Sequence, residues 1–150
     1  MNSWLVYWTP DDVDDFLRYD KFRVDCVGSN QKRFSMFEKG DIVWIHNIDV
    51  ENYHWLLGKI MLESKMDLEQ TQLTIGRKLV TGGQFSEYWI GEKPWNKIAE
   101  LDIGDLIPEM QFDPINPVPP KYSGQHFQQI RKLSEKDSAL MSERWDAHFG

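Results

Sequence analysis

Hydrophobic and polar positions alternate along much of this chain with a period that predicts short β-strands. Residues 4–8 (WLVYW) are apolar throughout, which is typical of a strand buried on both faces. In residues 42–46 (IVWIH), Ile42, Trp44 and His46 share one face, whereas Val43 and Ile45 share the other. Further strands are expected at residues 55–62, 72–75, 85–90 and 97–103. The pattern therefore predicts five or six short strands.

Helical signals lie near both ends of the chain. Thr9 is a good N-cap, Pro10 suits a first turn, and the acidic residues that follow favour a helix that fades near Asp20. A second helix is predicted at residues 124–133. Ser134 and Asp137 then open a third in the manner of a capping box, with Asp in place of Glu or Gln. Its buried side is expected to comprise Leu140, Met141 and Trp145. Helices at the ends and strands between them predict an α+β domain around a small barrel-like sheet.

The segments between these elements carry most of the candidate binding residues. Residues 25–37 read as a polar loop with Gly, Ser, Asn and two basic residues, and loops of this length are often functional. A polar hairpin at residues 47–53 puts Trp44 and Trp55 on adjacent strands. Gly58 marks a bulge or a close approach of another segment.

Length and composition indicate one folded domain covering residues 1–150. Of the 150 residues, 41% are hydrophobic and 27% charged, as in ordinary globular proteins. No apolar run approaches the roughly 18 residues of a membrane helix, and no secretory signal is recognisable at the start. Cys26 is the only cysteine, which excludes an internal disulfide. A cytoplasmic protein without a membrane partner is the default expectation, and the oligomeric state stays open.

The net charge of −7 argues against tight, sequence-blind binding to a phosphate backbone, which depends on Lys and Arg. The basic residues nevertheless form three pairs, Lys32-Arg33, Arg77-Lys78 and Arg131-Lys132. Either these pairs are ordinary solvated surface, or they form a local positive strip on an acidic body.

Tryptophan is unusually frequent, with seven residues in the chain. An indole offers a flat π-face and one N–H donor, which suits a planar ligand such as a nucleobase, although most such rings fill cores. We expect two or three of them to line a pocket. The seven are Trp4, Trp8, Trp44, Trp55, Trp89, Trp95 and Trp145.

Signatures of catalysis and of metal binding are weak. No nucleophile elbow, Walker loop or Gly-x-Gly-x-x-Gly motif occurs, and the four histidines lack metal-ligand spacing. A Cys–His pair that meets only in space remains an alternative for Cys26. We therefore predict no catalytic residue, no metal and no cofactor.

A binding constellation remains. It joins the loop from Gly28 to Arg33, whose backbone N–H groups can read the edge of a base, to Trp44 and Trp55, whose rings can stack on its face. The alternative is a surface loop beside core tryptophans.

The order of several short motifs resembles EVE and related domains of the PUA-like superfamily. They are the loop 27–30 (VGSN), followed by Lys32-Arg33, the turn and strand at 39–45 (KGDIVWI), the strand segment 57–60 (LGKI) and the C-terminal segments 122–125 (YSGQ) and 127–133 (FQQIRKL). The resemblance spans about residues 4–145. It implies a six-stranded pseudo-β-barrel flanked by helices, with a pocket for a flipped-out and often modified base, as in the related YTH domains.

The residues that match the family's motifs are Gly28, Ser29 and Asn30 in the pocket loop, Trp44 on the strand after the Gly-Asp turn, and Gln125 in the C-terminal motif. Several relatives have Trp-Ser in the loop, where this chain has Val27.

Together these patterns predict a non-catalytic reader of a nucleobase in DNA or RNA. Trp44 and Trp55 would stack, Gly28, Ser29 and Asn30 would read the base edge, and basic residues would contact phosphates. Those basic residues are Lys32, Arg33, Arg77 and Arg131. One alternative is a small hydrolase or ribonuclease of the ASCH type that uses Lys32, His46 or Glu87. Another is a peptide-binding module with an open aromatic groove.

Overall fold

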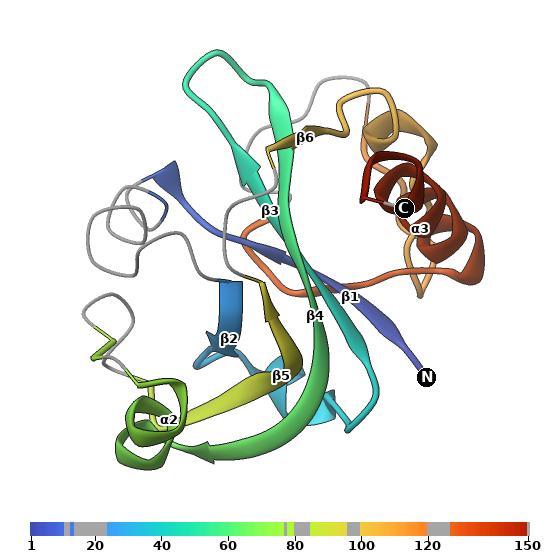
Figure 1. The fold of residues 1–150 in the computed structure, drawn as a ribbon. Helices are drawn as coiled ribbons and strands as arrows, with labels where there is room; N and C mark the ends of the chain where they lie inside the picture. Colours follow the sequence, from blue (N-terminus) through green and yellow to red (C-terminus); the bar gives the residue numbers. More distant parts are fainter. Residues whose placement is uncertain are drawn as a thin grey trace.

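A computed structural model describes residues 1–10, 13, 24–76, 78–79, 85–95, 100–119 and 127–149 (Figure 1). The strands are β1 (Ser3–Tyr7), β2 (Val24–Gly28), β3 (Ile42–Ile48), β4 (His54–Asp67), β5 (Glu87–Trp95), β6 (Leu101–Asp102) and β7 (Arg131–Lys132). The helical segments are the 3₁₀ helices η1 (Lys32–Met36) and η2 (Ile107–Glu109) and the α-helices α2 (Leu68–Ile75) and α3 (Glu135–Phe149).

The strands form one mixed sheet with the order β2-β5-β4-β3-β1-β7, and β6 pairs with β4 beside this path. β1 and β3 are parallel, whereas the other described pairs are antiparallel. This confirms the α+β class. Among the described strands, however, the end strands β2 and β7 do not pair with each other, so the sheet is not closed into the expected barrel.

The long strand β4 gives the sheet its curvature, because it extends from the β1–β3 region to the β2–β5 region (Figure 1). A Cβ added at Gly58 of β4 would lie 2.7 Å from Cγ1 of Val24 in β2. These strands are therefore in close contact across the concave side of the sheet, although β5 lies between them in the strand order. This confirms the close approach predicted at Gly58.

Apolar side chains cover both faces of the sheet. One cluster joins the sheet to α3, which lies along one side of the sheet in Figure 1, and we call it the α3-side core. The other lies within the curve of the sheet, and we call it the concave-side core. The α3-side core includes Leu5, Ile42, Trp44, Leu56, Met141 and Trp145. The concave-side core includes Trp4, Val6, Val27, Val43, Ile45, Leu57 and Trp89. The predicted alternation in β3 is thus confirmed, and both faces of β1 and β3 are covered.

Three sequence predictions of local structure are wrong. Residues 72–75 belong to α2, whose N-cap Asp67 accepts a hydrogen bond from Gln70 N and whose C-cap Gly76 is left-handed. Residues 25–28 belong to β2, which pairs with β5. Residues 131–132 form β7, which pairs with Leu5 and Trp4. These short segments take their structure from a cap or from a partner strand that is remote in the sequence.

Other predictions agree with the structure. The strands expected at 4–8, 42–46, 55–62 and 85–90 correspond to β1, β3, β4 and β5, although β4 is longer than predicted. Only Leu101 and Asp102 of the strand expected at 97–103 form β6, and residues 96–99 lie outside the described part. Most of the helix expected after Pro10 also lies outside it. None of the described helices combines the length and apolarity needed to cross a bilayer.

Candidate functional site

The loop after β2 is attached to the segment that leads into β7, nearly one hundred residues away in the sequence. Gln31 Nε2 donates to Gln128 O at 2.9 Å, and Gln31 Oε1 accepts from Ile130 N at 2.7 Å. Arg33 Nη1 donates to Ile130 O at 2.7 Å. These three contacts fix η1 against residues 128–130.

Arg33 and Arg131 lie close to this contact, and Lys32 precedes Arg33 in η1. We call Lys32, Arg33 and Arg131 the basic cluster. Arg131 lies over the ring of Phe112 at 3.9 Å and donates to Asn116 O at 3.0 Å. Partial burial lowers the pKa of Arg131, and the neighbouring charge of Arg33 lowers it further. No ion pair between described residues involves Lys32 or Arg33. Two guanidinium groups that repel each other in this way favour an anion beside them.

The segment 127–131 runs along β1 from the basic cluster toward the end that carries Trp8. Arg131 pairs with Leu5 in antiparallel β7. Phe127 packs edge-on against His46, which pairs with Tyr7 at the far end of β1. Trp8 is the next residue, so it lies about 10 Å along the strand from the row of Arg131.

At this end of the sheet, two indoles face the same side with an amide between them. Trp8 N donates to His46 O, and Asn47 Nδ2 donates to Trp8 O at 2.8 Å, so Trp8 lies beside Asn47. Asn47 pairs with Trp55 of β4 on its other side. Trp8 and Trp55 are both half-buried and pack against the concave-side core. We call Trp8, Asn47 and Trp55 the aromatic row.

Trp44 does not belong to this row, although it was expected to stack with Trp55. Its side chain is completely buried in the α3-side core and contacts Trp145 edge-on, with ring centroids 5.9 Å apart. Trp44 and Trp55 lie on adjacent strands, as predicted, but on opposite faces of the sheet. The two rings therefore cannot hold one ligand between them, and Trp44 is a core residue.

The expected loop residues differ in role. A Cβ at Gly28 would lie 2.5 Å from the Tyr88 ring and 2.8 Å from the Phe85 ring, so Gly28 allows close packing on β5. Ser29 Oγ accepts from Gln31 N at 3.0 Å and shapes the turn, while Asn30 is exposed beside it. Along the sheet, Gly28 aligns through Tyr88 with Met66, near the opposite end of β4 from Trp55.

The structure thus brings Ser29, Asn30, Lys32 and Arg33 together with the segment of Arg131, and places Trp55 in the aromatic row. Arg77 and Gln125 lie outside the described residues. Trp8 was one of the seven tryptophans considered for a pocket, but neither it nor Asn47 or Gln31 was among the predicted site residues. A pattern in the sequence could have identified Trp8. Trp4, Val6 and Trp8 occupy alternate positions, so their side chains lie on one face of β1 and of the residue that follows it.

The residues suggested for catalysis are not assembled. His46 is buried on the α3 side, whereas Lys32 is exposed on η1 and Glu87 forms an ion pair with Lys65 at 3.6 Å. The described residues contain no group of three or more His, Cys, Asp or Glu side chains suited to hold a metal ion. Cys26 is buried in a cluster with Tyr88 and Ile90.

His46 forms a buried pair with His54. His46 Nε2 and His54 Nδ1 are 2.9 Å apart, and Phe127 covers both rings edge-on. Burial lowers the pKa of His46 to about 3, and the charge of His54 adds to this effect. Burial also lowers the pKa of His54, partly offset by Asp102 and Asp49. At neutral pH the pair is uncharged, one ring donates to the other, and both rings pack against Phe127.

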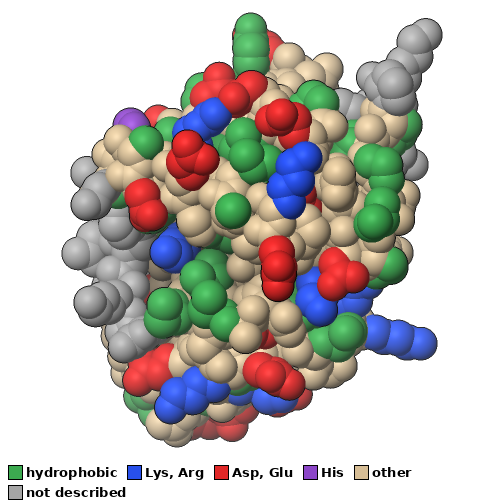
Figure 2. Space-filling view, turned by 90° about the vertical axis from the view of Figure 1, so that its right-hand side faces the viewer, with side chains coloured by type: hydrophobic (Ala, Val, Ile, Leu, Met, Phe, Trp, Pro, Cys, Tyr) green, Lys and Arg blue, Asp and Glu red, His purple; other side chains and the backbone are tan. Residues whose placement is uncertain are grey.

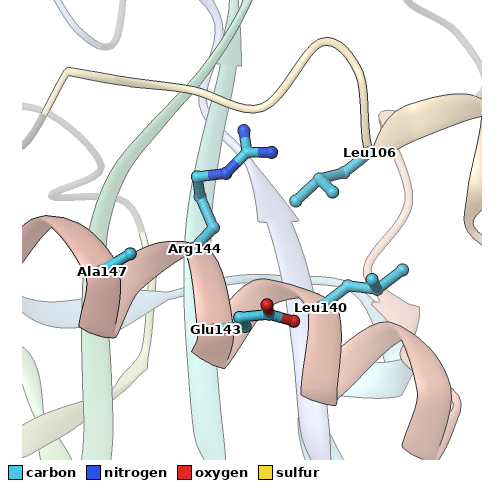
Figure 3. Close-up of a pocket in the computed structure, with 5 residues that line it drawn as sticks. All are labelled: Leu106, Leu140, Glu143, Arg144 and Ala147. Atoms are coloured by element: carbon cyan, nitrogen blue, oxygen red, sulfur yellow. The ribbon is translucent and has the colours of Figure 1, made fainter.

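The α3 face offers a different kind of surface. Figure 2 shows acidic, basic and apolar side chains interspersed on it. A shallow hollow of about 280 Å³ is lined by Leu106, Leu140, Glu143, Arg144 and Ala147 (Figure 3). Arg144 is held there by both carboxylate oxygens of Asp105. Because its charge is already neutralised, this hollow is a poor anion site.

Models of protein families give no match to this chain, and neither do the sequences of curated proteins.

Proposed function

We propose that this chain is a non-catalytic nucleic-acid-binding module that holds a single nucleobase on the aromatic row and phosphates at the basic cluster. The observation that carries the proposal is the position of these two features along β1, joined by the segment 127–131. In this proposal Trp8 takes the stacking role that was expected of Trp44, and Trp55 keeps its own. The resemblance of the sequence motifs to PUA-like domains supports the same function, and we propose that the curved sheet, although not closed among its described strands, is of the PUA-like type.

The spacing of the aromatic row suits one flat ring. Trp8 and Trp55 lie on either side of β3, so their backbones are about 10 Å apart, twice the spacing of neighbouring strands. Offset-stacked rings have centroids about 4.5–7 Å apart, so a base between the two indoles can contact both. Asn47 between them offers an amide to the base edge.

The balance of stacking energy and extraction cost favours a nucleobase that is not base-paired. Stacking contributes about 1–3 kcal/mol per base, whereas extraction of a paired base costs a few kcal/mol. The net charge of −7 also weakens long-range attraction to a nucleic acid. We therefore expect the module to prefer single strands, loops or bases that are already unpaired, with the basic cluster supplying the remaining affinity.

Fluorescence anisotropy with short labelled single-stranded oligonucleotides tests the proposal. Trp8→Leu keeps an apolar contact with the core but removes the π-face, and should weaken binding by about 1–3 kcal/mol. Arg33→Gln should weaken binding and reduce the slope of log K against log salt by about 0.7.

Lys136→Gln is the matched control, because Lys136 is exposed on α3 and the charge change is the same. It should leave the salt slope unchanged. Denaturant unfolding of each variant separates binding loss from loss of fold. Oligonucleotides that fail to bind the wild-type chain, or an equal effect of Lys136→Gln and Arg33→Gln, would overturn the proposal.

A further inference from the structure

A carboxylate is held against one ring of the aromatic row. Asp49 Oδ2 accepts the indole N–H of Trp55 at 2.9 Å. Its Oδ1 accepts Glu51 N at 2.9 Å and Tyr53 N at 3.0 Å, and Asp49 N donates to Tyr53 O. The β3–β4 turn therefore fixes Asp49 in position, and Asp49 in turn fixes the orientation of the Trp55 ring.

This carboxylate keeps its negative charge. The hydrogen bond from Trp55 lowers the pKa of Asp49, and the backbone N–H groups of Tyr53 and Glu51 lower it further. Asp49 takes part in no ion pair among the described residues. Asp102 of β6 also lies opposite Trp55, but its carboxylate accepts Gly104 N, whereas the indole N–H of Trp55 donates to Asp49. Asp49 is therefore the clearest source of negative charge beside the indole.

A charged acceptor on the indole N–H pushes electron density toward the ring, and the negative face of an indole attracts cations. The same carboxylate does nothing to favour a neutral base, which gains only stacking and area burial. A cation above Trp55 gains both the attraction of the ring and that of Asp49.

We infer that the aromatic row selects a base that carries a positive charge, such as 3-methylcytosine or 7-methylguanine. This inference rests on the proposed function and names the class of base that the row takes. The hydrogen bond between Asp49 and Trp55 and the presence of a second indole at Trp8 carry it. Asn47 completes the site, since its Nδ2 is engaged with Trp8 O and its Oδ1 can accept an N–H from the ligand.

A methylated lysine of a protein would satisfy the same two rings. The basic cluster favours the nucleic acid, because Lys32, Arg33 and Arg131 attract phosphates and repel a cationic peptide. A trimethyl-lysine peptide therefore serves as the competing ligand in the test.

The experiment compares methylation isomers that differ in charge at neutral pH. Short RNA strands carry one 3-methylcytosine (cationic) or one 5-methylcytosine (neutral), and a second pair carries 7-methylguanine (cationic) or 1-methylguanine (neutral). The wild-type chain should bind each cationic isomer about three- to thirty-fold more tightly than its neutral partner, the range expected of a cation–π contact. Asp49→Asn keeps the shape of the side chain and should reduce this preference, with little change for the neutral isomers.

Glu51→Gln is the matched control, since Glu51 is an exposed acid of the same turn without a described contact to Trp55. It should retain the preference. Equal binding of charged and neutral isomers, or an equal loss of preference in both variants, overturns this inference and leaves the proposed function standing. Absence of binding to every RNA strand overturns the proposed function itself, and tighter binding of the trimethyl-lysine peptide overturns the choice of ligand.

Discussion

The indole of Trp44 fills the space between β3 and α3. It is fully buried, packs edge-on against Trp145, and has the ammonium group of Lys59 5.4 Å from its ring centroid. Its N–H has no hydrogen-bond partner in the described part of the chain, so the ring contributes through packing and not through polarity. A side chain in this position stabilises the molecule and is out of reach of a ligand on the concave side.

Trp44→Ala should therefore lower the free energy of unfolding by about 3–5 kcal/mol, because it leaves a large cavity. Trp44→Phe should cost less, since it keeps most of the volume and removes an unsatisfied donor. Denaturant unfolding measures both. If Trp44→Phe folds and binds oligonucleotides as the wild type does, the ring is confirmed as core; a selective loss of binding would return Trp44 to the site.

Periodicity predicted which residues share a face, but not which face is accessible. Trp44 lies in β3 and Trp8 directly follows β1, both of which are covered on two sides, and only the neighbouring helix and strands distinguish them. The α3-side core is sealed by a helix almost one hundred residues away in the sequence. A pattern within five residues of β3 contains no information about that partner.

At the scale of elements, Asp137 joins α3 to the preceding chain. Asp137 N donates to Ser134 Oγ, and Asp137 Oδ2 accepts from Ser134 N, which completes the predicted capping box. The same carboxylate accepts Gln111 N at 3.0 Å and Phe112 N at 2.7 Å. Asp137, which stands where a capping box usually has Glu, thus binds the backbone of Ser134 and of residues 111–112. The ring of Phe112 in turn packs against the guanidinium group of Arg131.

Asp137→Ala should destabilise the fold by about 2–4 kcal/mol, because the carboxylate is completely buried and three backbone donors lose their acceptor. Asp137→Asn keeps one acceptor oxygen and should cost less. Thermal unfolding followed by circular dichroism measures the difference. Destabilisation below about 0.5 kcal/mol for Asp137→Ala, the size of an ordinary surface change, would contradict the role of this carboxylate.

Length did not decide which elements could be predicted, since β1 and β2 both have five residues. β1, β3, β4 and α3 have a continuous pattern or a local cap, and each was found near its expected position. β2 and β7 were not predicted as strands, because each acquires its structure from pairing with β5 or β1. The basic cluster depends on those pairings, so its residues could be named from the sequence but their contact could not.

At the scale of the whole molecule, the two cores and the aromatic row meet at the histidine pair. His46 and His54 lie one residue before Asn47 and Trp55 on β3 and β4, and on the α3 side they support Phe127. Phe127 anchors the segment that carries the Gln128 and Ile130 contacts of the basic cluster. The uncharged histidine pair therefore supports Phe127 and, through it, the segment 127–131, on which the proposed function depends.

Acidic pH should lower the free energy of unfolding through the His46–His54 pair. In the unfolded chain a histidine binds a proton near pH 6.5, whereas His46 in the folded chain resists protonation until about pH 3. Between these values the unfolded state holds more protons, so stability is complete above about pH 6.5 and falls as the pH decreases, by up to about 1.4 kcal/mol per pH unit for each such histidine. Denaturant unfolding between about pH 4.5 and 6.5, above the usual range of carboxylates, should show this slope.

His46→Gln should reduce this slope, whereas His148→Gln, at an exposed position near the end of α3, should not. A wild-type stability that stays flat over this range would mean that the pair accepts a proton without loss, and that the segment 127–131 is held by other contacts.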